Sequence, residues 1–320
     1  MNNYRLKCFL FICLFISLQM YGQVDSTYIG RFRQDFSVRT YFYQKFTSLS
    51  HIIEDEKEID YHPNNPVGIG LGVQYKNYSL SGGMTFDAFR NKKKGKTQSL
   101  DFQYHYYGRK FIADIFFQRY KGFYVEEQAE DGKKETIILH PDISLIQYGV
   151  NGQYVFNHKK FSYRAAFNQQ EKQLKSTGSF QLGGGFYYNR ISGDGTLVIN
   201  DHNQVSGYQL SISGGYVHTF VIKKNYFVSL AFSAGVSLGT ERLEDFFKSI
   251  DVIPNMYPRI SLGYNGDSWS VAINAVVNRI GVSYNKDVAL FVDTGRANLV
   301  IVKRFDSSPK FLQKIKFLNK

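Results

Sequence analysis

The sequence has few cysteines and no long hydrophobic run, and each of these two shortages excludes a class of protein. Its 320 residues include 2 Cys, 6 Pro and 1 Trp. Because both cysteines, Cys8 and Cys13, lie close to the N-terminus, a domain held together by disulfides is excluded. The mean hydropathy is −0.30, and no apolar run approaches the about 20 residues of a membrane-spanning helix. A polytopic helical membrane protein is therefore excluded as well.

Aromatic residues and glycine, in contrast, are abundant. The chain has 28 Phe, 24 Tyr and 28 Gly, and aromatics make up 17% of it, which excludes an intrinsically disordered chain. Basic residues outnumber acidic ones by 39 to 27, a formal net charge of +12. They are dispersed over the expected loops and turns and do not gather on one face, so we do not expect nucleic acid as a partner.

Residues 1–22 have the features of a secretory signal peptide. The basic residues Arg5 and Lys7 precede an apolar stretch over 8–18, which suits a signal peptide but is too short to span a membrane. We predict that this segment is removed near Gly22–Gln23. The mature chain then has no cysteine, so its stability has to come from burial or from a membrane and not from disulfides.

Beyond the leader, hydrophobic residues recur at every second position. The segments 67–76, 208–219 and 226–239 show this most strictly, because large apolar residues there alternate with Gly, Ser and Gln. Successive side chains of a strand point to opposite faces, so these are strands with one apolar face and one small, polar face. Similar segments occur at 36–46, 78–86, 98–107, 111–120, 145–156, 161–168, 179–190, 257–265, 268–278 and 296–305.

These strands fit a transmembrane antiparallel β-barrel with meander topology better than a soluble sandwich or a lipocalin-like barrel. Many of them reach the about 9–11 residues that cross a bilayer. Rows of Gly, Ser, Gln and Asn suit a hydrated lumen, and aromatics such as Tyr75, Tyr226 and Trp269 lie near segment ends, as interfacial girdles require. We predict a single barrel domain over 23–305 and a basic tail over 306–320.

The connections predict which end of the barrel faces the periplasm and how many strands the barrel has. Short turns alternate with long connections, which is typical of outer-membrane barrels with short periplasmic turns. With 36–46 as the first strand, both termini fall on the periplasmic side. The alternation slips once, because 169–178 and 191–206 are both long with one strand between them. An extra strand at 196–200 would restore the phase and give 14 strands. Without it and without the first segment the number is 12, so we predict about 12–14.

One stretch carries more than periodicity. Residues 161–173 are FSYRAAFNQQEKQ, residues 176–180 are STGSF, and YHPN at 61–64 precedes a Gly-alternating strand. This pattern resembles a family from Bacteroidetes-type bacteria that is catalogued as a domain of unknown function (number 4421). The resemblance covers roughly 28–305. It implies an outer-membrane β-barrel of undetermined activity and supplies no reaction.

The strand predicted at 161–168 brings polar side chains to the lumen. Its alternation directs Phe161, Tyr163, Ala165 and Phe167 to lipid and Ser162, Arg164, Ala166 and Asn168 inward. The same counting on the neighbouring strands predicts one polar network in the lumen, formed by Asp101, His105, Asp114, Arg164, Asn168 and Glu171.

Two interpretations of this network stay open. The first is an ion-pair lattice that fills the interior, since arginine pairs with carboxylates in bidentate geometry. The second is an active site of a lipid-active enzyme, an acyl hydrolase or transferase, with His105 as base and Ser99 or Ser162 as nucleophile. Barrel enzymes that act on lipid place the nucleophile outward, toward lipid and near the rim. Both serines are expected to point inward, which argues against the enzyme. The scattered histidines lack metal-ligand spacing, and we expect neither metal nor cofactor.

The sequence therefore predicts an exported, integral protein of the bacterial outer membrane. The role that we predict is that of a structural or pore-type envelope protein with a polar lumen, and a lipid-active enzyme is the alternative. Outer-membrane lipid and lipopolysaccharide are the expected contacts, the latter through the basic loop at 91–96. Envelope proteins are further candidate partners.

Overall fold

The computed structural model describes residues 24–53, 57–75, 78–128, 135–193, 195, 197, 203–240, 251–284 and 288–310. The expected signal peptide and most of the basic tail lie outside these residues. Among the described residues, no helix is both long and apolar enough to cross a membrane.

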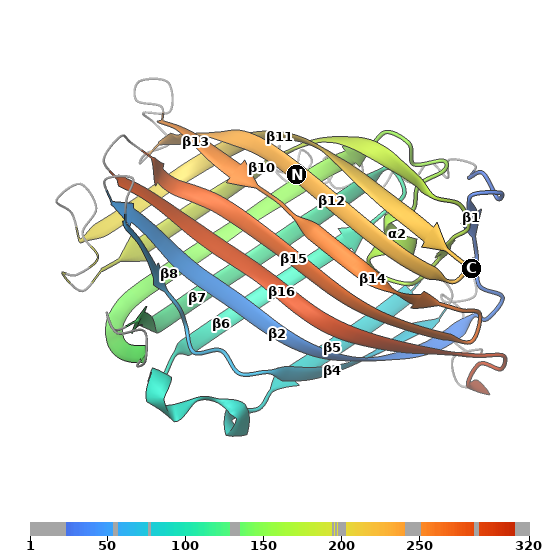
Figure 1. Ribbon diagram of the computed structural model, residues 1–320, viewed down its shortest axis with the longest axis horizontal. Helices are drawn as coiled ribbons and strands as arrows, with labels where there is room; N and C mark the ends of the chain where they lie inside the picture. Colours follow the sequence, from blue (N-terminus) through green and yellow to red (C-terminus); the bar gives the residue numbers. More distant parts are fainter. Residues whose placement is uncertain are drawn as a thin grey trace, which may run out of the picture.

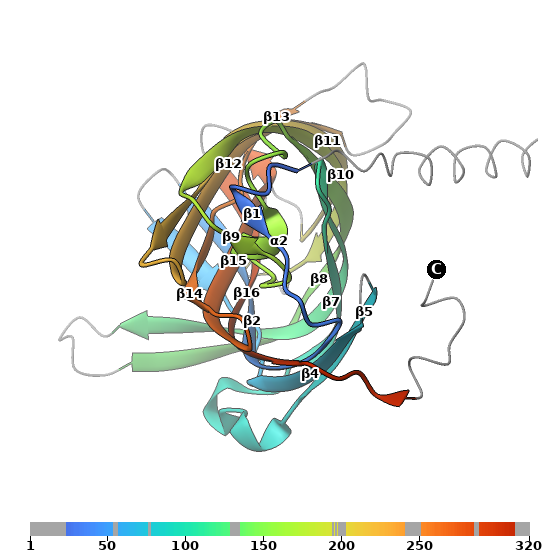
Figure 2. The same cartoon turned by 90° about the vertical axis from the view of Figure 1, so that its right-hand side faces the viewer.

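The chain forms one large antiparallel sheet that curls round a central space (Figures 1 and 2). Its neighbours, in order, are β5 (Tyr78–Thr85), β4 (Gly68–Tyr75), β2 (Phe36–Ile53), β16 (Val288–Phe305), β15 (Trp269–Tyr284), β13 (Asp251–Met256), β12 (Tyr226–Thr240), β11 (Gln204–Ile222), β10 (Thr177–Ser192), β8 (Glu135–Val155), β7 (Phe111–Gln128) and β6 (Gln98–Tyr107). Two more strands, β3 (Lys57–Tyr61) and β14 (Arg259–Asn265), bring the sheet to 14. The predicted antiparallel barrel is confirmed.

Twelve strands stand side by side round the wall, because two of the 14 strands occupy a place that another strand already holds. β13 and β14 pair with β12 in one continuous register, from Gly239↔Asp251 to Tyr226↔Tyr264, and are separated only by Tyr257 and Pro258. β3 is a short addition to the end of β2. β5 and β6 stand at the two ends of the strand order, and no pairing joins them within the described part of the chain.

The two faces of the sheet have opposite character. On β12, Leu230 and Phe232 are exposed on the outer face, whereas Ser229 and Ser233 are buried on the inner one. The same division holds round the wall: Ile212 is 61% exposed and Gln118 is 0% exposed. A soluble protein has the reverse arrangement, so the outer face is built for an apolar medium.

The two ends of the barrel differ as well. The turn end, defined by the short connections 108–110, 223–225 and 266–268, also carries the start of β2 and the end of β16, where Phe36 pairs with Phe305. The loop end carries the connection over 86–97, which contains the 3-10 helices η1 (Asp87–Phe89) and η2 (Lys92–Lys94). In outer-membrane barrels the short turns face the periplasm.

The prediction of a wall strand at 161–168 is wrong. This segment enters the lumen at the turn end, where it forms the helix α2 (Tyr163–Ala166) and then β9 (Lys172–Gln173), which pairs with β1 (Ile29–Gly30) (Figure 2). Phe161 and Tyr163, expected to face lipid, are 1% and 2% exposed. Ser162 caps the helix, since its Oγ accepts a hydrogen bond from the Ala165 N–H at 3.1 Å.

The position of 161–168 inside the lumen also explains why the alternation of short and long connections is interrupted in the sequence. With 161–168 removed from the wall, the whole chain between β8 and β10 is one connection at the turn end, and the long connection after β10 lies at the loop end. The strand expected at 196–200 falls almost entirely outside the described residues. Its described residue, Leu197, is buried and belongs to no strand.

Candidate functional site

The most distinctive feature of the barrel is a plug, residues 161–173, that occupies the lumen at the turn end (Figure 2). Its apolar side chains are held against inward-facing residues of the wall. The members of this cluster are Phe161, Tyr163, Ala166 and Phe167 of the plug and Ile112, Val155, Val217 and Ala231 of the wall. Tyr107, Tyr163 and Phe167 form a cluster of three rings, in which the Tyr163 centroid lies 5.9 Å from that of Tyr107 and 5.4 Å from that of Phe167, and the other two are 6.3 Å apart. The plug is therefore a packed part of the core.

The carboxylate of Glu171 is the main polar anchor of the plug. Arg109, from the turn between β6 and β7, donates to Oε1, and Arg164 Nη1 lies 3.5 Å from the same oxygen. Ser162 Oγ donates to Oε2 at 2.6 Å. The Glu171 side chain is 4% exposed, and a buried carboxylate needs such partners to remain charged.

Two more arginines of the wall hold the backbone that follows the helix. Arg39 of β2 donates to the side-chain oxygen of Asn168 and, at 3.0 Å, to its carbonyl oxygen. Arg304 of β16 donates to the carbonyl oxygen of Gln169 at 2.6 Å and to Ser270 Oγ at 2.8 Å. Gln169 has a φ of 49°, a backbone conformation that L-residues adopt infrequently. The hydrogen bond from Arg304 holds Gln169 in this conformation.

A second cluster lies beside the plug and is centred on Asp114. His105 Nδ1 lies 2.6 Å from Asp114 Oδ1, and Arg259 donates to Oδ2. His105 and Asp114 are a cross-strand pair of β6 and β7, which the short turn between these strands made predictable. Arg259 comes from β14, on a different part of the wall, so it crosses the lumen to reach the carboxylate.

Asp101 belongs to a third cluster. Lys45 Nζ lies 3.1 Å from Asp101 Oδ1, and Tyr120 OH donates to Oδ2 at 2.5 Å. The predicted network is therefore divided. Arg164 is joined to Glu171 and His105 to Asp114, while Asn168 and Asp101 each have partners that were not predicted.

The loop end of the lumen is closed by apolar side chains. Leu49, Leu145 and Leu290 are all 0% exposed and come from β2, β8 and β16. The other members of this cluster are Tyr61, Tyr120, Phe123, Val125, Ile143, Ile191, Leu197, Val282 and Val292. The polar middle of the barrel is thus enclosed between the plug and this apolar cap.

Neither predicted serine is placed as a nucleophile. Ser162 Oγ bonds to Glu171 and to the Ala165 N–H, and within the described residues no hydrogen bond joins His105 to Ser162 or Ser99. The described part of the chain also contains no group of three His, Cys, Asp or Glu residues arranged to hold a metal ion.

Comparison with known proteins gives a family and a set of distant folds. The family described as "Domain of unknown function (DUF4421)" matches residues 23–305. No curated protein matches the chain.

Similar solved structures are outer-membrane proteins of bacteria. The outer-membrane protease OmpT of Escherichia coli has 8% identity and a TM-score of 0.37, with 88% of this chain and 100% of that chain covered. The toluene transporter TodX of P. putida has 8% identity and a TM-score of 0.30, with 86% and 91% covered. OprG of Pseudomonas aeruginosa has 12% identity and a TM-score of 0.21, with 87% and 99% covered. Such distant similarity carries no functional argument.

Proposed function

The chain belongs to the DUF4421 family, whose description assigns no activity, and we propose that it is an integral β-barrel of the bacterial outer membrane whose lumen is closed by its own plug. In this proposal the chain is exported by the leader over 1–22 and serves as a structural envelope protein and not as an open pore. Lipids and lipopolysaccharide contact its outer wall, and envelope proteins are its further partners.

The outer face supports the membrane location. Large apolar side chains are exposed round the wall, including Leu71, Phe180 and Ile273, and transferring this surface from water to lipid is favourable. At the turn end Trp269 and Tyr226 are exposed, and Lys303 Nζ lies 4.5 Å from the centroid of the Trp269 ring. Aromatic and basic residues together are typical of the interface between lipid and water.

The contacts of Glu171 support a closed lumen and carry this proposal. A loosely placed loop would leave the plug carboxylate in water, but here it is buried and bonded to Arg109 and Ser162. Breaking such a buried ion pair is strongly unfavourable, by about 3–5 kcal/mol. The plug is consequently expected to stay in place in the resting protein.

Conductance in planar lipid bilayers tests the proposal. Refolded mature protein that migrates in a heat-modifiable way on a detergent gel is expected to insert without opening a stable channel. A steady, ohmic conductance of the wild-type protein would contradict the closed barrel. Solubility of the mature chain without detergent would contradict the membrane location.

A lipid-active enzyme is the second candidate, and the contact of His105 with Asp114 favours it. A carboxylate on Nδ1 can orient an imidazole as a general base. However, Asp114 is also held by Arg259, which suits an ion-pair cluster equally well. Assay of phospholipid turnover by the purified barrel and by His105→Ala distinguishes the two, because only an enzyme would lose an activity.

A further inference from the structure

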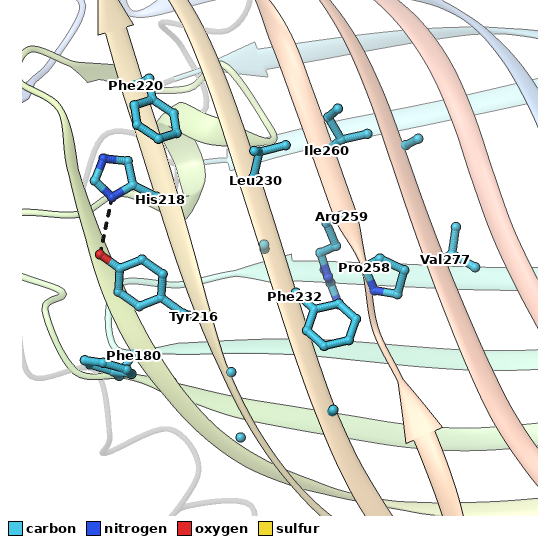
Figure 3. A pocket seen from close by; sticks show the side chains of 15 residues that line it. Phe180, Tyr216, His218, Phe220, Leu230, Phe232, Pro258, Arg259, Ile260 and Val277 are labelled. Carbon is cyan, nitrogen blue, oxygen red and sulfur yellow. Dashed lines mark hydrogen bonds between the residues drawn. The ribbon is translucent and has the colours of Figure 1, made fainter.

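The lipid-facing side of the wall contains a depression of about 850 Å³ (Figure 3). It spans β10, β11, β12, β14 and β15, and its lining includes the small residues Gly214, Ala234 and Ala275. Larger side chains such as Phe180 and Phe232 border it. Small residues on adjacent strands leave the hollow, which is open to the medium round the barrel and almost wholly apolar in its lining.

A polar pair lies at one edge of this depression. His218 follows Tyr216 on the outer face of β11, and its Nδ1 lies 3.3 Å from the Tyr216 hydroxyl (Figure 3). Its ring packs 4.3 Å from that of Phe220. Nε2 of His218 has no partner among the described residues. An ionisable side chain on a membrane-facing surface is costly and marks a functional position.

Two lysines stand beyond the histidine in the turn between β11 and β12. Lys223 and Lys224 are exposed and have φ values of 47° and 69°. Asn and Gly are strongly preferred where a hairpin turn needs positive φ. Lysine at both positions is unfavourable for the backbone, and the two side chains bring positive charge to the turn end.

The spacing of these groups matches the length of a lipid. Lys223 lies nine positions after Gly214, or about 30 Å along a strand at about 3.3 Å per residue. With a strand tilt of about 40° this is about 23 Å along the membrane normal, close to half of the about 40–45 Å thickness of a bilayer with its headgroups. Exposed Tyr226, two positions after Lys224, is one of the aromatic residues that mark the interface at the turn end. The lysines therefore fall at headgroup depth, and the depression falls at acyl-chain depth.

We propose that this surface is a binding site for an anionic phospholipid of the leaflet at the turn end. One acyl chain fills the depression over Gly214 and Ala234, His218 Nε2 donates to an ester carbonyl oxygen, and Lys223 and Lys224 pair with the phosphate. The proposal rests on the membrane location proposed above. The site is separate from the lumen and needs no movement of the plug.

Two leucine substitutions on the lipid face test the depression. A Cβ at Gly214 would have as its nearest neighbour the carbonyl oxygen of Gln181, at 3.8 Å, and a Cβ at Gly82 would meet nothing within 4 Å. The added side chain of Gly214→Leu therefore begins without a clash at Cβ and extends over the depression, and Gly82→Leu is the matched control. The measurement is native mass spectrometry of refolded barrel after incubation with phosphatidylglycerol or phosphatidylcholine. Gly214→Leu is expected to bind phosphatidylglycerol about tenfold more weakly than the wild type. This is the loss expected when about two methylene groups of the acyl chain are no longer buried in the depression.

The variant Lys223→Asn with Lys224→Gly tests the charge. It supplies a turn sequence that suits positive φ, so a loss of binding cannot come from a weakened hairpin. The preference for phosphatidylglycerol over phosphatidylcholine is expected to disappear in it. The proposal is overturned if Gly214→Leu and Gly82→Leu bind lipid alike, or if the wild type shows no preference for the anionic lipid.

The same variants distinguish a lipid site from an interface between two copies of the chain. A wild-type dimer that Gly214→Leu dissociates would assign the surface to a second copy and overturn the lipid site. Every variant is first checked for heat-modifiable migration. A wild-type protein that fails this check would overturn the membrane location itself, whereas a failure of the lipid comparison in inserted barrels would leave that location intact.

Discussion

Arg259 donates a hydrogen bond to Asp114 across the lumen, although 145 positions separate the two residues in the chain. The bond joins β14 to β7, which are far apart in the strand order. Asp114 also contacts His105 at 2.6 Å, so one carboxylate links three strands. This ion pair holds two sides of the wall at a fixed distance from each other next to the plug.

The tie between Arg259 and Asp114 is expected to contribute strongly to stability. Arg259→Met leaves the buried carboxylate with one partner and should lower the free energy of unfolding by about 3–5 kcal/mol. Replacing both partners, with Arg259→Met and Asp114→Leu, should cost less than the single change, because no buried charge is then left unpaired. Urea unfolding in phospholipid vesicles, followed through the fluorescence of Trp269, provides the measurement. Equal or greater loss in the double variant would contradict this role of the ion pair.

The anchor of the plug can be tested with a thiol probe, since both cysteines lie in the predicted leader. Ala166→Cys places a thiol at a position that is 0% exposed within the plug, and a maleimide reagent should label it slowly. Adding Glu171→Gln removes the charge that Arg109 and Arg164 contact. Labelling should then become at least about tenfold faster, because a hydrogen bond to a charged group contributes about 1.5–3 kcal/mol.

An exposed thiol serves as the control for this labelling experiment. Lys224→Cys lies in the turn at the same end of the barrel and is exposed, so its labelling rate should be fast and unaffected by Glu171→Gln. An equally fast reaction of Ala166→Cys in the otherwise unchanged chain would show that the plug is not held in the lumen.

The wall was predictable from sequence because strand alternation is a local property. Each residue of β12 is assigned to a face by its position alone, and the short turn at 108–110 brings His105 opposite Asp114. The same local rule failed at 161–168. Alternating Phe161 and Tyr163 satisfy it equally well when they are buried in a lumen.

The wall residues that contact the plug could not be predicted from local sequence patterns. Arg39 and Arg304 meet Asn168 and Gln169 only because the barrel has a particular circumference and the plug a particular depth. Arg109 looked like an ordinary turn residue. The one signal in the sequence was the slip in connection lengths, which disappears once the segment before β10 is removed from the wall.

The glycines of β4 make room for two tyrosines that line the lumen. A Cβ at Gly70 would overlap the ring of Tyr41, and Arg296 stacks over both Tyr41 and Tyr43, at 4.9 Å and 4.6 Å from the ring centroids. Gly70→Ala should therefore destabilise the barrel by about 1–3 kcal/mol, as overpacking does. Gly82→Ala, on the neighbouring strand, meets nothing within 4 Å and should have little effect. Comparable unfolding curves for the two variants would contradict this role of Gly70.

The loop end contains a contact that should respond to pH. His62 and Tyr124 exchange two backbone hydrogen bonds, with N–O distances of 2.8 and 2.9 Å. Burial lowers the pKa of His62, and Lys94 lowers it further, while Asp60 and Glu126 act in the opposite direction. Because the folded state favours the neutral ring, this contact contributes fully above pH 6.5, the ordinary pKa of histidine, and is weakened as the pH falls through the lower pKa of the folded state.

Hydrogen exchange of the Tyr124 amide between about pH 7.5 and about pH 5 measures this effect, after correction for the intrinsic dependence of exchange on pH. Protection should decrease on acidification in the wild type and stay constant in His62→Gln, which cannot acquire the charge. His158→Gln, at the turn end, is the matched control and should keep the wild-type response, because His158 contacts the carbonyl oxygen of Val155 and not the loop end. An unchanged pH response in His62→Gln would show that another group controls this end of the barrel, and the carboxylates Asp60 and Glu126 would then be the next to substitute.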